Sequence, residues 1–209
     1  MAAKKALTAT ERWALPANQT RSRATRERLL TAAEQVFAEK GYDGARLSDI
    51  AEEAGCSVGA VYFRFKDKDA LFFAIAESFI EEARTGLGAL LGDTSSMKPD
   101  GVVRLFVTAT ARSFERHKGL FRAIVERGLD HPHAMKTIMA FREELAAALE
   151  KALRGGSEAS LPVRVMTQMI YGFMLTGILN KHAPTRFGDR RAVDELTKAC
   201  VAYLSVARS

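Results

Sequence analysis

The sequence has 209 residues, 47% of them hydrophobic and 27% charged, so it is long enough to fold around a real core as one large domain or two small ones. A formal net charge of +6 at pH 7 permits a nucleic-acid partner without demanding one. No segment approaches the roughly 18 unbroken apolar residues of a membrane span, and the two cysteines argue against a disulfide framework and fit a reducing cytoplasm.

The N-terminal arm carries most of this charge. Residues 1–28 hold two acidic residues against seven basic ones, which are Lys4, Lys5, Arg12, Arg21, Arg23, Arg26 and Arg28. Such an arm is either a solubilising tail or a segment that contacts phosphates, and composition does not separate the two. No apolar run follows Lys4 and Lys5, so we expect no signal peptide. We assign residues 1–21 to a basic flexible arm.

The first predicted elements are three helices close together in the chain. The first has an apolar stripe at helical spacing, formed by Leu29, Leu30, Ala33, Val36 and Phe37. Ser22 or Thr25 is expected to cap its start, and Gly41 to end it. A short helix over about 47–54 and a stub of helix over about 58–65 follow.

The rest of the chain continues at helical spacing. Asp67 is expected to cap a long helix that runs from Lys68 to about Leu91. Five more helices are predicted over about 102–116, 120–127, 132–153, 162–182 and 190–207. No strand pattern competes with them. The predicted fold is therefore all-α with about nine helices, in which an N-terminal three-helix helix-turn-helix domain over 22–66 precedes a larger helical bundle over 67–209.

The stretch "IAEEAGCSVGAVYFRF" at 50–65 has the residue types of a helix-turn-helix. Ala51 supplies a small residue where the helices cross, Gly55 tolerates the positive φ of the turn, and Ser57 caps the second helix. In such a motif the N-terminal end of the second helix enters the major groove of DNA. An ordinary helical hairpin would explain the glycine turn. It would not explain the short second helix or the residues gathered at its tip, which are Tyr62, Arg64, Lys66 and Lys68.

From about Arg23 to Phe73, the sequence resembles the DNA-binding domain of the tetracycline-repressor (TetR) family of transcriptional regulators. The segments that carry the resemblance are "LLTAAEQVFAEKGYDG" (29–44), "LSDIAEEAGCSVGAVYFRF" (47–65) and "KDKDALF" (66–72). They match the family's pattern of a helix ending in Phe and Gly-aromatic, an "IA..AG.S.G..Y..F" core, and a Lys followed by "..L" at the start of the next long helix. The resemblance covers about a quarter of the chain.

The resemblance implies that the segment from Ser57 to Phe63 lies in the groove, and that Tyr62 and Lys68 hold phosphates. The predicted DNA-binding residues are Arg46, Ser57, Val58, Gly59, Ala60, Tyr62, Phe63, Lys66 and Lys68.

Two departures from the family's pattern bear on this assignment. Ala45 and Arg46 stand where members usually have Thr followed by Ser or Thr, which removes a helix cap worth about 1 kcal/mol. We expect Ser48 to cap a slightly later start, and Arg46 to contact DNA instead. Val58 and Ala60 stand where a Lys or small polar residue and a Thr are common. An apolar pair there predicts contact with thymine methyl groups rather than hydrogen bonds to guanine.

The resemblance also implies a second domain that binds a small molecule and dimerises through its last two helices. The segment "MIYGFMLTGIL" (169–179) is apolar nearly all round and so needs cover on both sides, and Gly172 and Gly177 allow close approach. The last helix has a stripe of Val193, Leu196, Ala199, Cys200, Tyr203 and Leu204, which suits a four-helix interface. A helix buried within one subunit is the alternative. We predict a homodimer through the helices at about 162–182 and 190–207.

The predicted ligand site lies on the helices that enclose the family's pocket. Its residues are Phe106, Phe114, Phe121, Met139, Met166, Met169, Tyr171, Phe173 and Met174. Met and Phe line adaptable apolar sites, although any one of these residues taken singly is better explained as ordinary core. As a group they favour a mostly apolar ligand that accepts aromatic contacts, with Tyr171 as the predicted polar contact.

The sequence has no "HExxH", P-loop or "GxGxxG" signature of catalysis. We therefore predict that the protein is not an enzyme. His131 and His133 have no further ligand residues nearby, so we expect neither a metal site nor a cofactor. We expect His117 and His182 on the surface at helix ends, and Cys200 to be buried rather than reactive.

These features together predict a cytoplasmic, dimeric transcriptional repressor that binds a palindromic operator and is released by a small apolar or aromatic molecule. Ligand binding would move the helix over 68–91 and so change the spacing of the two recognition helices. The sequence does not distinguish an activator or a co-repressor-dependent regulator of the same fold, and it identifies neither effector nor operator. A small-molecule-binding or scaffold protein without operator binding is the alternative from another class. The basic residues Arg64, Lys66 and Lys68 argue against it.

Overall fold

The structure, a computed structural model, describes residues 20–92, 94–127, 132–153, 156–180 and 189–207. Within these ranges the chain forms nine helices and no strand, which confirms the predicted all-α fold. The helices are α1 (Thr20–Gly44), α2 (Leu47–Glu53), α3 (Val58–Tyr62), α4 (Lys68–Leu91), α5 (Pro99–Arg116), α6 (Lys118–Arg127), α7 (Pro132–Ala152), α8 (Leu161–Leu179) and α9 (Arg190–Ala207). Most of the N-terminal arm, residues 1–19, lies outside the described residues, as do His131 and His182.

Several helix ends follow the predicted capping chemistry. Asp67 Oδ1 accepts the backbone N–H of Ala70 at 2.7 Å and so starts α4 at the predicted residue. The helical geometry of α1 breaks at Gly41, which has a φ of 73°. The stub α3 is shorter than predicted and ends at Tyr62, because Phe63 is already its C-cap.

The start of α2 differs from the prediction. Ser48 does not cap this helix, which begins at Leu47 with Arg46 as its N-cap residue. The backbone N–H of Arg46 donates to Asp49 Oδ2 at 3.1 Å. Asp49, the third residue of the helix, thus satisfies the N–H of the N-cap residue with its side chain. Lys40 lies 3.0 Å from the same carboxylate oxygen and, with this backbone hydrogen bond, lowers the pKa of Asp49.

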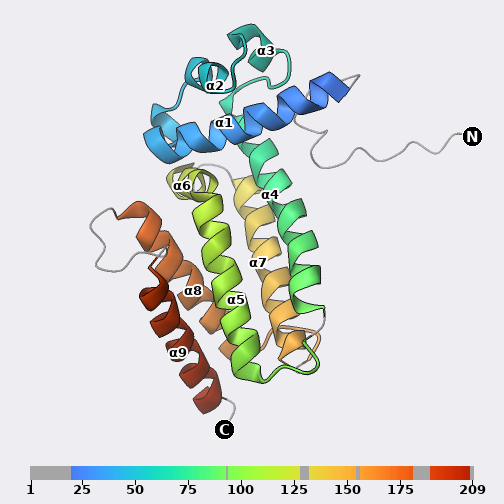
Figure 1. Ribbon diagram of the computed structural model, residues 1–209, viewed down its shortest axis with the longest axis vertical. Coiled ribbons are helices and arrows are strands. Elements are labelled where there is room, and N and C mark those ends of the chain that lie inside the picture. The colour runs from blue at the N-terminus through green and yellow to red at the C-terminus, as the bar shows by residue number, and fades with distance from the viewer. Residues whose placement is uncertain (1–19, 93, 128–131, 154–155, 181–188, 208–209) are drawn as a thin grey trace, which may run out of the picture.

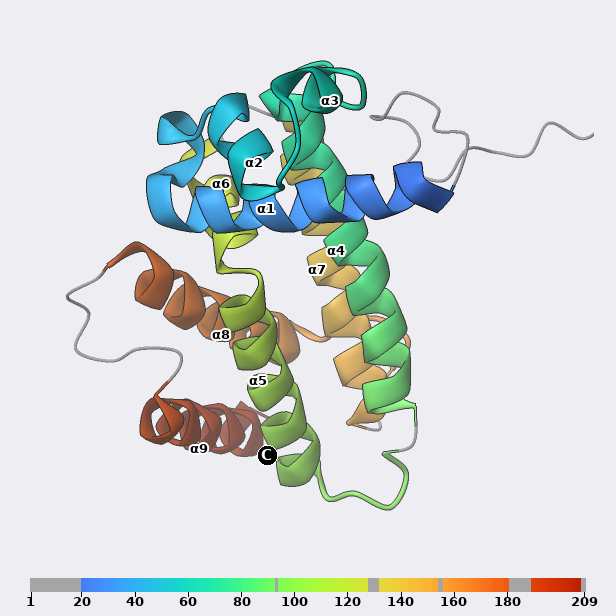
Figure 2. The same ribbon diagram turned by 45° about the horizontal axis from the view of Figure 1, so that its top comes forward.

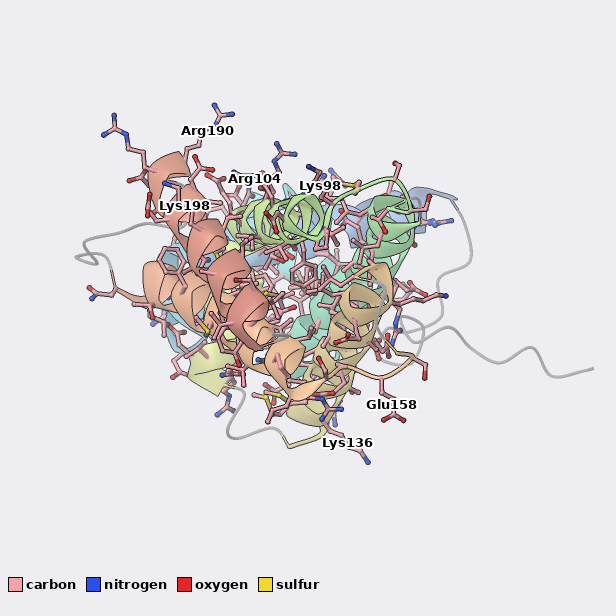
Figure 3. All side chains as sticks on the ribbon, turned by 90° about the horizontal axis from the view of Figure 1, so that it is seen from below. Lys98, Arg104, Lys136, Glu158, Arg190 and Lys198 are labelled. Atoms are coloured by element: carbon pink, nitrogen blue, oxygen red, sulfur yellow. The ribbon has the colours of Figure 1, made fainter. Side chains whose placement is uncertain are left out.

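The helices are arranged with the three N-terminal ones together at one end (Figure 1). Helix α4 runs from this end down the length of the molecule beside α7, while α5 packs against α9, and α9 against α8. Helix α6 lies directly against α1 (Figure 2). Viewed from the far end, charged side chains such as Lys98, Arg104, Lys136 and Lys198 stand at the periphery of the bundle (Figure 3).

The hydrophobic core is continuous from the first helix to the last. Buried side chains from Leu29 in α1 to Leu204 in α9 belong to one packed cluster. Phe65, Leu71 and Phe72, on either side of the boundary proposed between residues 66 and 67, are all fully buried in it. The division of the chain into two domains at this boundary therefore stays a prediction. Because the core is continuous, packed side chains can transmit movement across the boundary.

Candidate nucleic-acid interface and bundle cavity

The tip of the molecule is built by the turn between α2 and α3. Gly55 has a φ of 62°, the left-handed conformation that the sequence predicted for this turn. The backbone N–H of Cys56 then donates to the Ala51 carbonyl at 2.9 Å, which brings the chain back across α2. Ser57 Oγ accepts the N–H of Ala60 at 3.2 Å and caps the stub as predicted.

The stub has one buried side and one exposed side. Val61 and Phe65 are fully buried in the core, and the stub packs against α2. Val58, Tyr62 and Phe63 are 39%, 55% and 61% exposed, respectively, which is unusual for large apolar and aromatic side chains. A surface of this kind on so short a helix contributes little to folding and is available to a partner.

The predicted DNA-binding residues are gathered at this tip, but their side chains are not all equally free. Arg46, Ser57, Gly59 and Lys66 are exposed, and Ala60 is half-buried. Arg64 folds back, since its Nη1 donates to the Ala60 carbonyl at 3.1 Å and its guanidinium lies 5.7 Å from the Phe63 ring centroid.

The resemblance implied that Lys68 binds a DNA phosphate, but its ammonium is engaged within the chain. Its Nζ donates to the backbone carbonyls of Tyr42 at 2.6 Å, Asp43 at 3.4 Å and Ala45 at 2.9 Å. The ammonium also lies 4.4 Å from the Tyr42 ring centroid, and burial lowers its pKa. All three N–H donors of an ammonium already have partners in this arrangement. Lys68 therefore holds the C-terminal end of α1 against the start of α4.

Tyr42 connects the same end of α1 to two further helices. Its backbone N–H donates to Glu126 Oε2 of α6 at 2.6 Å, and its hydroxyl donates to Asp69 of α4. Burial, reinforced by the hydrogen bond to Asp69, raises the pKa of this phenol, so it stays neutral at physiological pH. Arg122 Nη1 of α6 adds a hydrogen bond of 2.9 Å to the Ala38 carbonyl.

The corner between α5 and α6 also contacts α1. His117 Nδ1 lies 3.1 Å from Glu34 Oε1, and because an ionised carboxylate only accepts, Nδ1 is the donor. The imidazole packs edge-on to Phe79, with ring centroids 5.0 Å apart. The side chain of His117 is only 13% exposed, so the prediction of a surface histidine is wrong: it is at a helix end but turns inward.

A cavity of about 640 Å³ lies inside the bundle, within the size range of small-molecule sites. It is lined by α4, α5, α6, α7 and α8 and is partly open to solvent. Most of its wall is apolar, including Phe79, Ile80, Leu87, Phe106, Leu120, Phe121, Ile124, Ile138, Phe141 and Leu145. The polar and charged residues of the wall are Glu82, Thr110, Arg112, Ser113, Arg116, His117, Arg142 and Tyr171.

Aromatic rings form a connected wall in this cavity. Phe114 and Phe121 stack with centroids 3.7 Å apart and planes 4° from parallel. Phe79 meets Phe121 edge-on at 5.3 Å, and Tyr171 lies 5.7 Å from Phe114. The Arg142 guanidinium covers the Tyr171 ring at 4.6 Å. The rings thus run from Arg142 on one side to His117 on the other.

Of the nine predicted ligand residues, five line the cavity: Phe106, Phe114, Phe121, Met139 and Tyr171. The other four, Met166, Met169, Phe173 and Met174, do not. Met166 and Met174 are fully buried in the core, whereas Met169 is exposed on the opposite side of α8. The reason is helical phase, because Tyr171 and Leu175 are the positions of α8 that turn toward the cavity.

Sequence reasoning missed several cavity residues, notably His117, Phe141 and Arg142. Arg142 had a signal that could have identified it. It occurs within the apolar stripe of Ile138, Phe141 and Leu145, where a charged side chain needs a special reason. Burial raises the pKa of the Tyr171 phenol, so its hydroxyl is a neutral hydrogen-bond donor.

The described part of the chain lacks two other kinds of feature. No group of three His, Cys, Asp or Glu side chains there could hold a metal ion. No helix there is long and apolar enough to cross a membrane.

Comparison with known sequences places residues 29–75 in a family model described as bacterial regulatory proteins, tetR family. YvdT of Bacillus subtilis, described as an uncharacterized HTH-type transcriptional regulator, is 33% identical over 61% of this chain and 64% of its own length. The HTH-type transcriptional repressor BepR of Brucella suis is 51% identical over 24% of each chain. The chain thus spans less than two thirds of the length of these relatives.

Comparison with solved structures covers more of the chain. The TetR-family regulator PfmR from Thermus thermophilus superimposes with a TM-score of 0.60 at 23% identity, over 85% of this chain and 97% of its own. A candidate TetR-family regulator from Mesorhizobium loti gives a TM-score of 0.68 at 20% identity, over 90% and 98%. At these identities the likeness concerns the fold, and it extends through both the helix-turn-helix and the bundle.

Proposed function

We propose, from the premise that this chain belongs to the TetR family of bacterial regulatory proteins, that it is a transcriptional repressor. It binds a palindromic operator as a homodimer in the cytoplasm and releases the operator when a small molecule enters the bundle cavity. The observation that carries the proposal is the tip, where a capped five-residue helix exposes Val58, Tyr62 and Phe63 while Val61 anchors it.

The tip has the chemistry of a major-groove reader. Val58 and Ala60 offer apolar contacts to thymine methyl groups, and Tyr62 offers a hydroxyl to a phosphate. Lys66 and Arg46 are exposed and are the cations we assign to the DNA phosphate backbone. Lys68 supports this surface indirectly, because it fixes α1 to α4 beneath the stub.

A second copy of the chain would cover the exposed side of α8. Leu161, Val165 and Met169 recur on it every four residues and are exposed, and a Cβ at Gly172 would meet no atom within 4 Å. On α9 the small side chains of Ala199 and Ala202 and the larger one of Val206 are exposed as well. Apolar and small residues of this kind suit a four-helix interface between two subunits. Two-fold symmetry is what a palindromic operator requires.

Release by a ligand follows from how the cavity is attached to the tip. Helix α4 lines the cavity through Phe79 and Ile80, and its first turn is bonded to α1 through Asp69. A ligand that prefers a wider cavity would displace α4 and change the spacing of the two tips in the dimer. A ligand that binds both arrangements equally would leave operator affinity unchanged.

The test is a binding assay of the purified full chain against DNA flanking its own gene, at two salt concentrations, with Tyr62→Ala as the control. Tight, salt-sensitive binding to one palindromic segment that Tyr62→Ala abolishes is the expected result. Failure on that DNA and also on a pool of random sequences would overturn the proposal in favour of a ligand-binding or scaffold protein. If the free protein sediments as a monomer at the assay concentration, the homodimer is no longer part of the proposal.

A further inference from the structure

We infer that the cavity takes an amphipathic anion, a carboxylate on an aromatic or alkyl body, with Arg142 as the residue that pairs with the carboxylate. This inference rests on the proposed function, because it names the class of molecule that would act as effector. The apolar wall alone would accept an uncharged or a cationic guest equally well, and the charges decide between them.

The first step is the balance of charge on the cavity wall. Three arginines line it, Arg112, Arg116 and Arg142, against one carboxylate, that of Glu82. Arg116 Nη1 lies 2.7 Å from Glu82 Oε1, so this carboxylate is already compensated. Arg112 and Arg116 are exposed, so solvent screens their charges, whereas Arg142 is half-buried. The Arg142 guanidinium would repel a cation bound beside it, whereas an anion would compensate its charge.

The second step is the environment of Arg142. Its guanidinium donates to Gln168 Oε1 and lies 3.7 Å from Met139 Sδ, and both partners are neutral. The neighbouring acids on α7 are engaged elsewhere, Glu143 with Arg164 at 3.2 Å and Glu144 with Arg84 at 2.7 Å. Within the described ranges, Arg142 therefore has no carboxylate partner, although it is half-buried and stacked on Tyr171.

The third step is the hydroxyl next to it. Tyr171 is buried, and its ring is held between Arg142 and Phe114, yet its hydroxyl hydrogen-bonds to none of the described residues. Because Tyr171 lines the cavity, its neutral hydroxyl can donate to a bound carboxylate, which can accept from it and from a guanidinium at once. From this point the stacked rings of Phe114 and Phe121 continue the wall, which is where the apolar body would lie.

The experiment uses three probes with one skeleton: 2-naphthylacetate, 2-naphthaleneethanol and 2-naphthaleneethylammonium. Their dissociation constants for the full chain are measured by calorimetry without DNA. The carboxylate should bind about tenfold or more tighter than the alcohol, and the ammonium weakest, since charge-assisted hydrogen bonds are about twice as strong as neutral ones. Binding of the ammonium as tightly as the carboxylate, or of none of the three, would overturn the inference.

The variants locate the charge. Arg142→Gln should bring the carboxylate-to-alcohol ratio of dissociation constants close to one, and Tyr171→Phe should reduce the preference several-fold while keeping the ring under the guanidinium. The matched control is Arg84→Gln, another guanidinium over a ring, 5.8 Å from the Phe141 centroid, but paired with Glu144 and outside the cavity wall. An unchanged ratio in Arg142→Gln would overturn the assignment. The alcohol serves as the internal reference for correct folding of each variant.

Operator binding is scored separately, in the absence of probes. Carboxylate preference that depends on Arg142 in a protein that binds no DNA would leave this inference standing and remove the proposed repressor function. Operator binding in a protein that shows no preference for the carboxylate would leave the proposed repressor function standing and overturn this inference.

Discussion

The main chains of Glu34 in α1 and Gly119 in α6 touch, so closely that a Cβ at position 119 would lie 1.8 Å from the Glu34 carbonyl oxygen. The carboxylate of the same Glu34 bonds His117, and His117 lines the cavity. The helix that supports the tip, for which we propose DNA binding, therefore rests directly on one wall of the cavity. This contact is a second route, beside α4, by which a ligand could act on the tip.

Replacing Gly119 by Ala should separate the two helices. Because the obstacle is backbone rather than a flexible side chain, we expect a loss of about 1–3 kcal/mol in the free energy of unfolding, measured by chemical denaturation. The control is Gly88→Ala on α4, where a Cβ would meet nothing within 4 Å and helix propensity predicts a gain of up to about 1 kcal/mol. Equal stability of the two variants would contradict the close contact.

Replacing Glu34 by Ala should weaken the communication between cavity and tip. The hydrogen bond from His117 is lost, which we expect to cost about 1.5–3 kcal/mol of stability because one partner is charged. The ratio of operator affinities with and without saturating 2-naphthylacetate should move toward one, measured by fluorescence anisotropy. Glu39→Ala, an exposed acid on the same helix, is the control. The same ratio in wild type and Glu34→Ala would exclude this route.

Replacing Gly59 by Ala separates folding from DNA binding. A Cβ there would lie 3.8 Å from Ser57 Oγ, an ordinary contact, so nothing within the chain requires glycine. Stability should rise by up to about 1 kcal/mol, as it does when a helical glycine becomes alanine. Operator affinity should fall, because the methyl group intrudes where the backbone approaches DNA. Unaltered affinity would mean that the stub is not in close contact with the groove.

Lys66 and Lys68 should behave as different kinds of lysine. Lys66→Gln should leave stability within about 0.5 kcal/mol and reduce the slope of log affinity against log salt by about 1. Lys68→Met should cost about 1–3 kcal/mol of stability, since the carbonyls of Tyr42 and Ala45 lose their donor. If Lys68→Met is as stable as wild type and only its salt slope falls, Lys68 is the phosphate ligand that the family resemblance implied.

The buried thiol of Cys200 should make the free energy of unfolding depend on pH. Burial raises the pKa of its thiol to about 11 from the ordinary value of 9.0. Between these values the unfolded chain loses the proton and the folded chain keeps it, so the thiol's contribution is intact below pH 9 and is lost as pH rises to 11. The unfolding free energy of the wild type should fall faster over this interval than that of Cys200→Ala, by at most about 1.4 kcal/mol per pH unit. Parallel pH profiles would show that this thiol ionises freely.

Much of this fold could be read from the sequence, because helices are specified locally. Asp67 and Ser57 cap the helices they were expected to cap, and Gly55 takes the positive φ that its turn needs. The apolar periodicity predicted α4 and α9 with their observed bounds. Capping, glycine turns and a repeat of 3.6 residues involve only near neighbours in the chain, so a single sequence is enough to recognise them.

The functional assignment of side chains was decided by tertiary structure. Helix α8 is apolar nearly all round, so its pattern could not say that Tyr171 faces the cavity, Met166 the core and Met169 the outside. Lys68 meets carbonyls of α1, and His117 meets Glu34, through contacts 25 or more residues apart in sequence. By itself the sequence determined which segments are helices and where they turn. Only the packing of those helices decided which side chains share the cavity, because that depends on the phase and position of one helix against another.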